Sequence, residues 1–229
     1  MVLNRESIKN GIVQDMLAEG ERMGLLRCWT KAEREASRAE ILERKPPGPV
    51  WVFAYGSLIW NPAFDFAAKT RGRLHGYHRS FCLWAPLGRG TPDNPGLLLA
   101  LKPGGSCNGL LYRLHDDDRL IEELDIIWAR EMVTGSYLPR WFRVQTEDGP
   151  VSAISFAIGP DCDRFARTLS VEEAAQSIAT ASGKLGSCYE YFENTVHALD
   201  DMDIVDARLH ELQNEINRRR QAAPQGTPS

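Results

Sequence analysis

The chain has 229 residues and a formal net charge of -4, from 27 Lys and Arg against 31 Asp and Glu. Its length suits one domain or at most two, and a chain of this size holds a core without disulfides or a structural metal. The charge balance gives no general electrostatic reason to bind nucleic acid or an anionic membrane. The N-terminal segment lacks the apolar core of a signal peptide, and no run approaches about 20 apolar residues. We therefore expect a cytoplasmic protein with no nucleic-acid or membrane partner.

The cysteines and histidines show no metal-binding spacing. The five cysteines are widely separated, and no Cys-x-x-Cys pair or Cys/His cluster occurs. This pattern argues against a zinc site and against a disulfide scaffold. The five histidines form no His-x-x-x-His pair, and no glycine-rich nucleotide loop is present. The residues themselves thus give no reason to expect a metal or a cofactor.

The first 45 residues have the pattern of polar helices. Apolar residues recur every four positions from Ile8 to Met16 and predict one apolar stripe. Thr30 and Glu33 have the spacing of a capping box, so a second helix should begin at Thr30. Its face over residues 31–38 is most simply a solvated surface, and docking on a partner or on the core is the alternative. A proline-rich segment then ends the helical region.

From residue 50 the pattern becomes that of β-strands. Asp148 and Gly149 separate the last two runs and favour a tight hairpin, because glycine accepts a positive φ there. Six short strands over so short a stretch indicate a closed or highly curved sheet rather than repeated βαβ units. The expected strands cover residues 50–55, 74–84, 97–101, 110–114, 141–146 and 151–158.

Helices interrupt and follow this sheet. Ser170 and Glu173 supply a second capping box, and Gly183 is a plausible end for the helix that begins there. The chain thus divides into a helical N-terminal extension over 1–48, a core over 49–217 and a flexible tail over 218–229. The expected helices of the core cover residues 119–130, 170–183, 189–199 and 204–216.

One candidate site is the segment Val52–Ser57, where a strand runs directly into a glycine turn. Such a turn exposes consecutive backbone amides, and Gly56 lets a ligand approach the main chain closely. These amides and the Ser57 hydroxyl are suited to hold a carboxylate, although an ordinary strand end is the simpler interpretation of this segment alone. Ser57 lacks the Gly-x-Ser-x-Gly pattern of a nucleophile elbow, which argues against a serine hydrolase.

Two other segments carry weaker signals. Glu131 lies at the expected C-terminal end of a helix, where the helix dipole opposes negative charge and raises a carboxyl pKa. A surface salt bridge with Arg130 is the more common arrangement for such neighbours. Residues 88–96 are rich in turn formers and form a loop, either a mobile one beside a site or a mere connector.

Several motifs occur together along the chain. They are Val52 to Trp60, Arg89-Gly90-Thr91 with Pro95-Gly96, Arg130-Glu131-Met132, Tyr137, and the closing segment with Tyr191, Asn194, Thr195 and Asp206. Together they resemble the ChaC-like glutathione-specific gamma-glutamylcyclotransferases, over about residues 50–212. Two features depart from the family pattern: Asp203 stands where the closing segment usually has glycine, and the N-terminal extension lies outside the core match.

The resemblance implies an α+β fold, a small β-barrel flanked by helices, with the glycine turn at one end. It implies a cofactor-independent carbon–nitrogen lyase of the amidine-lyase class that releases 5-oxoproline and cysteinylglycine from glutathione, with no metal. By residue-by-residue transfer, Glu131 would handle the proton and Tyr137 would line the pocket. The γ-glutamyl group would be held by Val52, Phe53, Ala54, Tyr55, Gly56 and Ser57.

This reaction needs no protein nucleophile, because the substrate α-amine closes on its own γ-carbonyl. Well-oriented intramolecular attack reaches effective molarities of about 10⁵–10⁸ M. An α-amine with a pKa near about 8 is mostly protonated at neutral pH, so the enzyme needs a base for that proton and an acid for the departing amine. One carboxyl of raised pKa serves both purposes. The amides near Gly56 and Ser57 would hold either the substrate carboxylate or the developing oxyanion.

Two alternatives remain open. A cyclotransferase for other γ-glutamyl amines or amino acids would share this chemistry and differ only in its contacts with the leaving group. A catalytically idle barrel that binds a small carboxylate or a protein partner is the other alternative. The presence of Glu131 together with an intact Tyr55-Gly56-Ser57 turn argues against it. The sequence leaves the oligomeric state open.

Overall fold

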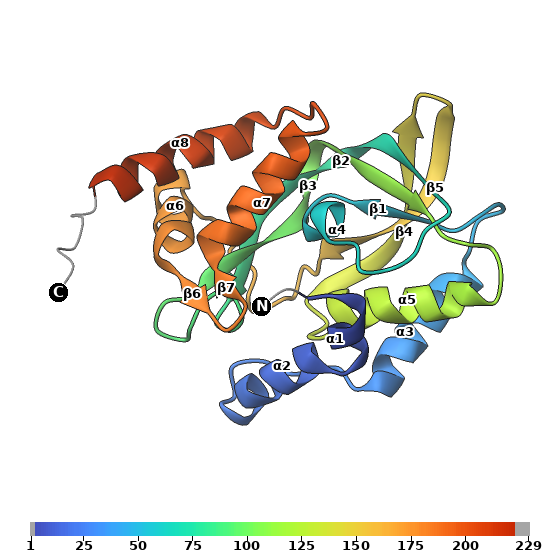
Figure 1. The fold of residues 1–229 in the computed structure, drawn as a ribbon, viewed down its shortest axis with the longest axis horizontal. Helices are drawn as coiled ribbons and strands as arrows, with labels where there is room; N and C mark the ends of the chain where they lie inside the picture. The colour runs from blue at the N-terminus through green and yellow to red at the C-terminus, as the bar shows by residue number, and fades with distance from the viewer. Residues whose placement is uncertain (1–2, 223–229) are drawn as a thin grey trace.

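The structure is a computed structural model that describes residues 3–222 (Figure 1). Its centre is a closed β-barrel with the strand order β1-β3-β2-β4-β5, closed by parallel contacts of β5 with β1 and β3. This confirms the expected α+β fold built on a small barrel. The barrel strands are β1 (Trp51–Ala54), β2 (Ala68–Ala85), β3 (Gly96–Arg113), β4 (Tyr137–Thr146) and β5 (Gly149–Ile158).

The expectation of six short strands was wrong, because the runs at 97–101 and 110–114 belong to one strand, β3. The turn-forming residues between them do not end the strand, since they lie opposite a register shift between His75 and Tyr77 of β2. Gly104 and Gly105 take φ values of 99° and 73° at this irregularity. A bulge therefore absorbs a sequence that resembles a turn. The hairpin expected at Gly149 is confirmed: the residue has a φ of 109° and begins β5.

Helices lie on two sides of the barrel, with the C-terminal helices at the left of Figure 1 and the N-terminal helices below the strands. Within residues 3–222, no helix is both long enough and apolar enough to cross a membrane. A two-stranded sheet, β6 (Ser182–Gly183) with β7 (Gly186–Ser187), was not predicted. The helices are α1 (Arg5–Lys9), α2 (Ile12–Arg22), α3 (Lys31–Glu43), α4 (Ser57–Trp60), α5 (Arg119–Glu131), α6 (Val171–Thr180), α7 (Cys188–Asp200) and α8 (Ala207–Ala222).

The single apolar stripe expected near the N-terminus is divided between α1 and α2. Gly11 has a left-handed φ of 78° and breaks the helix, which resets the face that the following residues present. The buried side chains of α2 are therefore those of Val13 and Leu17, whereas Met16 is only partly buried.

The capping boxes at Thr30 and Ser170 are both confirmed, each with the two reciprocal hydrogen bonds. Helix α6 ends at Thr180, before Gly183, which instead lies in β6. Helix α8 begins later than expected and continues to Ala222, so the first part of the expected tail is helical. The remainder of that tail, residues 223–229, lies outside the described residues.

Residues 31–38 are solvated only in part, because one side of α3 docks on the core, which was the alternative to a solvated face. The Trp128 indole Nε1 donates to Ser37 Oγ at 3.3 Å, and Arg38 forms an ion pair with Asp125. The Trp141 indole donates to the Ile41 carbonyl at 2.8 Å. These polar contacts explain why a sequence with few apolar residues still packs against α5 and β4.

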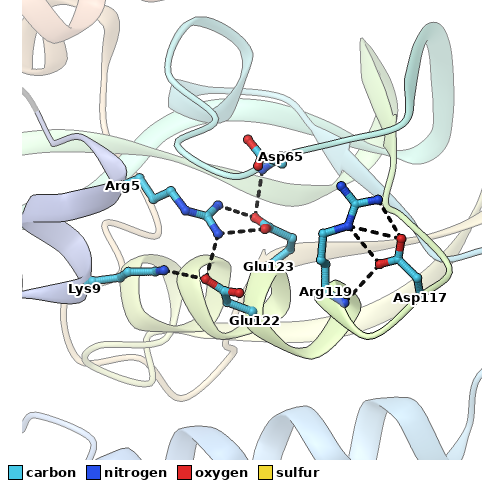
Figure 2. A network of polar contacts seen from close by, with 7 residues as sticks. All are labelled: Arg5, Lys9, Asp65, Asp117, Arg119, Glu122 and Glu123. Atoms are coloured by element: carbon cyan, nitrogen blue, oxygen red, sulfur yellow. Dashed lines mark hydrogen bonds and ion pairs between the residues drawn. The ribbon is translucent and has the colours of Figure 1, made fainter.

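A buried carboxylate fixes α1 to α5 (Figure 2). Glu123 is 1% exposed, and both of its oxygens accept hydrogen bonds from Arg5, at 2.6 and 2.8 Å. The Asp65 backbone amide donates to the same carboxylate at 2.8 Å. The pair therefore joins the N-terminal extension, α5 and the loop after α4.

We expect Arg5→Ala to lower the free energy of unfolding by about 2–4 kcal/mol, because it leaves the Glu123 charge buried without its cation. The matched control is Lys9→Ala, which removes a second cation of the same helix. Lys9 pairs with Glu122, and both side chains are about half exposed, so its loss should cost at most about 0.5 kcal/mol. Urea unfolding followed by circular dichroism measures both values. Equal, small losses in the two variants would contradict the assignment.

Candidate active site

The glycine turn lies at one end of the barrel, where β1 leads into α4. Tyr55 is buried, and its hydroxyl donates to the Phe156 carbonyl at 2.8 Å. Its backbone carbonyl accepts from the Arg79 guanidinium at 2.7 Å. Gly56 itself has a φ of -139°, outside the left-handed region. The turn is thus held by hydrogen bonds from two barrel strands rather than by a positive φ at glycine.

Arg79 is a buried cation directly beneath this turn, 2% exposed. Besides the Tyr55 carbonyl, it donates to the Asn108 carbonyl of β3, and its Nε lies 3.0 Å from an oxygen of Asp206. It therefore ties the turn to β3 and to the residue before α8. The sequence analysis did not select Arg79 as a site residue. The sequence did contain one sign of its role: Arg79 is a basic residue at a position of an apolar strand that should face the core.

Arg130 and Glu131 end α5 and face the same turn. Arg130 Nη2 donates to Ser57 Oγ at 2.8 Å, and its Nη1 donates to the Asn61 carbonyl. Its Nε lies 3.3 Å from Glu131 Oε1, and the two side chains are 7% and 14% exposed. The sequence analysis treated a surface salt bridge as the more common arrangement of such neighbours, but this pair is buried. Arg130 positions the turn and neutralises the carboxylate at the same time.

Burial raises the pKa of the Glu131 carboxyl, and the nearby Arg130 cation opposes that rise. Burial also raises the pKa of Tyr137 well above its ordinary value and that of Tyr191 to about 12. Both phenols therefore stay protonated at neutral pH, and the Tyr137 hydroxyl donates to the Leu99 carbonyl at 2.8 Å. The site therefore contains a carboxyl group that can gain and lose a proton, and beside it lie phenol groups that stay neutral.

These residues surround two adjoining cavities. A small inner cavity lies against the turn, and a larger one of about 210 Å³ adjoins it. Ser57, Glu131, Tyr137 and Tyr191 line both cavities. The inner cavity is lined by Ala54, Tyr55, Gly56, Ser57, Leu58, Leu99, Glu131, Tyr137, Phe156 and Tyr191.

Most of the site residues expected from the sequence thus come together around the inner cavity. They are Ala54, Tyr55, Gly56, Ser57, Glu131 and Tyr137. Val52 and Phe53 do not border either cavity. They are 0% exposed and lie in the barrel wall, paired with Tyr112 and Leu111 of β3. Their place is beneath the turn, as part of the packing that supports it.

Other residues that line the larger cavity were not among the expected site residues, although Tyr191 and Arg89 belong to the motifs of the resemblance. Tyr191 of α7 packs edge-on against Trp60, with ring centroids 6.1 Å apart. The loop at 88–96 does border the site, because Gly88 and Arg89 line the larger cavity.

An outer apolar wall of the larger cavity comes from the N-terminal extension, through Val13, Met16, Leu17 and Leu26. The helical pattern of the extension indicated an apolar face but not the surface that it covers.

Among residues 3–222, no group of three or more His, Cys, Asp or Glu is arranged to hold a metal ion.

Comparison with known proteins gives consistent matches. The model of the ChaC-like protein family matches residues 50–219. A glutathione-specific gamma-glutamylcyclotransferase of Escherichia coli is 42% identical over 186 residues, which cover 80% of each chain. Gamma-glutamylcyclotransferase 2-1 of Arabidopsis thaliana is 32% identical over 180 residues, 74% of this chain and 82% of the relative.

A solved structure supports the fold. The crystal structure of a yeast gamma-glutamyl cyclotransferase specific to glutathione has a TM-score of 0.69. The match covers 77% of this chain and 99% of the yeast chain at 21% identity, so it bears on the fold alone. From the family match and the sequence identities, the chain belongs to the ChaC-like protein family.

Proposed function

We propose that this protein is a glutathione-specific gamma-glutamylcyclotransferase, which converts glutathione to 5-oxoproline and cysteinylglycine. The observation that carries the proposal is the buried Glu131 carboxyl on an inner cavity formed by the glycine turn. The E. coli relative, 42% identical over 80% of each chain, is a glutathione-specific gamma-glutamylcyclotransferase, and this supports the same activity. The five free cysteines fit a reducing compartment, and we propose the cytoplasm, where glutathione is available.

The γ-glutamyl group of the substrate would occupy the inner cavity. The backbone amides of Gly56 and Ser57 lie at the start of α4, and Arg130 donates to the Ser57 hydroxyl. This end of the cavity is therefore electropositive and suited to an anion. Two anions of the reaction fit it: the α-carboxylate of the bound substrate and the oxyanion that develops on the γ-carbonyl.

Glu131 would then move the proton. As a carboxylate it removes a proton from the substrate α-ammonium, and the free amine attacks the γ-carbonyl carbon to form the new C–N bond of the five-membered ring. The protonated Glu131 next donates to the nitrogen of the departing cysteinylglycine as the original C–N bond breaks. The ring nitrogen then still carries one proton more than the lactam product, and Glu131, again a carboxylate, removes it and passes it to the amine of the released dipeptide. The proton balance closes with this transfer, and a raised pKa brings the carboxyl closer to the operating pH, where it can both accept and donate a proton.

We expect Glu131→Gln to lower kcat by about 10²–10⁴-fold, because the amide keeps the shape of the side chain but cannot exchange the proton. The matched control is Glu122→Gln on the same helix, whose exposed carboxylate faces away from the cavity and whose loss should leave the rate unchanged. Mass-spectrometric detection of 5-oxoproline measures both. A folded Glu131→Gln protein with the normal rate would refute the assignment.

The pKa of Glu131 also predicts a pH dependence. Since the carboxylate form is the base, kcat/KM should rise with pH through a midpoint above the ordinary glutamate value of about 4.3. Stability should change in the opposite sense. The folded state binds the Glu131 carboxyl proton more tightly than the unfolded chain does, because the pKa is raised in the folded state. The contribution of Glu131 to the free energy of unfolding therefore declines as pH rises through the raised pKa. The change in stability across this pH range should therefore be smaller in Glu131→Gln, which has no carboxyl to titrate, and urea unfolding of both proteins at several pH values measures it. An activity midpoint at or below about 4.3 would contradict this assignment.

A third test concerns the space at Gly56. A Cβ at this position would lie 3.4 Å from Leu99 Cδ1 and 3.7 Å from the Tyr191 hydroxyl, which is ordinary contact. Gly56→Ala should therefore keep kcat/KM within about threefold. The two further carbons of Gly56→Val have no such space and should lower kcat/KM by about 100-fold or more, by displacing the groups that position the substrate. Equal activity of the two variants would remove the turn from the site.

A further inference from the structure

Arg164 is a cation on the larger cavity that the proposed chemistry does not use. It follows β5, and its guanidinium is mostly buried. Its Nη1 donates to the Trp84 carbonyl at 3.1 Å, and its Nη2 donates to the hydroxyls of Thr134 and Ser136 at 2.7 and 2.6 Å. All three acceptors are neutral. A guanidinium has five N–H donors, so these bonds leave two of them for another partner.

Arg164 also differs from the other arginines of this cavity. Arg89 pairs with Glu190 at 2.9 Å, and Arg130 pairs with Glu131 at 3.3 Å. Among residues 3–222, no carboxylate lies within 4.0 Å of the Arg164 nitrogens. Burial lowers its pKa, and the groups that oppose this effect are two thiols and a phenol. A buried cation without an anion is costly, so this position favours a negatively charged ligand.

The charge count of the cavity agrees with that requirement. Its charged lining consists of three arginines and two glutamates, which gives one positive charge in excess. Glutathione has one ammonium group and two carboxylates, so it brings one negative charge in excess. One of its carboxylates belongs to the γ-glutamyl group in the inner cavity. The other is the terminal carboxylate of the dipeptide that leaves.

The position of Arg164 fits the reach of that dipeptide. The guanidinium is anchored on Thr134 and Ser136, in the short segment that joins Glu131 to Tyr137. Thr134 lies three positions after Glu131, so their Cα atoms are at most about 11 Å apart, and two extended peptide residues span about 7 Å. The dipeptide of a substrate whose γ-carbonyl lies beside Glu131 is therefore comparable in length to the distance between Glu131 and this segment.

We propose that Arg164 binds the terminal carboxylate of the leaving dipeptide and so contributes to the selection of glutathione among γ-glutamyl compounds. This assignment rests on the proposed function. It gives the larger cavity a role in specificity, separate from the proton transfer at Glu131. The bond to the terminal carboxylate forms on binding and persists through the reaction, so its effect should fall on KM rather than on kcat.

The test compares glutathione with its glycinamide analogue, in which the terminal carboxylate is a carboxamide. Wild type should use the analogue with a kcat/KM lower by about 10–100-fold, mainly through KM. Arg164→Gln should lose the same factor on glutathione and use the two substrates almost equally. Arg164→Lys, which keeps the charge, should restore part of the preference. The matched control is Arg167→Gln, since Arg167 is exposed on the same segment and does not line the cavity. It should retain the full preference.

Two results would overturn the proposal. One is a wild-type protein that uses both substrates equally, a measurement that needs no variant and decides the matter even if Arg164→Gln does not fold. The other is a folded Arg164→Gln protein that still prefers glutathione by the wild-type factor, whether or not its overall activity falls. Failure of the proposed function looks different, because wild type would then release 5-oxoproline from neither compound.

Discussion

The site depends on one buried ion pair, that of Arg130 with Glu131. A lone carboxylate in this position would simply bind a proton and become neutral, because desolvation penalises its charge. Arg130 limits that effect, and it also donates to the Ser57 hydroxyl and the Asn61 carbonyl. The same cation therefore sets the proton affinity of the carboxyl and the position of the turn opposite it. A buried pair of this kind contributes little net stability, so its value here lies in the chemistry of the cavity.

The turn is also held from below, and this connects the C-terminal helices to the site. Arg79 links the Tyr55 carbonyl to Asp206, immediately before α8. Helix α7 brings Tyr191 to the cavity, and the connection between α7 and α8 contains Asp203 at a left-handed φ of 53°. Aspartate tolerates this left-handed conformation better than most residues, so Asp203 fits a position whose backbone also suits glycine. The two helices thus form one unit with the end of the barrel.

Local features of this fold were predictable, and tertiary ones were not. The capping boxes at Thr30 and Ser170 and the hairpin at Gly149 follow from contacts within a few residues. The same local rules failed in the middle of β3, where a bulge opposite β2 accommodates glycines that resemble a turn. The candidate turn and Glu131 were selected through the family resemblance, because the combination of their motifs is specific although each segment alone is not. Arg79 and Arg164 were missed because their importance comes from partners distant in the sequence.

The N-terminal extension lies outside the matched family segment, yet it completes the larger cavity with an apolar wall that includes Val13 and Leu17. Its attachment runs through α5, since Arg5 holds the buried Glu123 of that helix. Glu131 lies on the same helix, about two turns further along. One rigid element therefore carries both the anchor of the extension and the carboxyl of the site. The position of the cavity wall and the position of the proposed proton-transfer group are consequently fixed relative to each other, although the residues that form them are far apart in the chain.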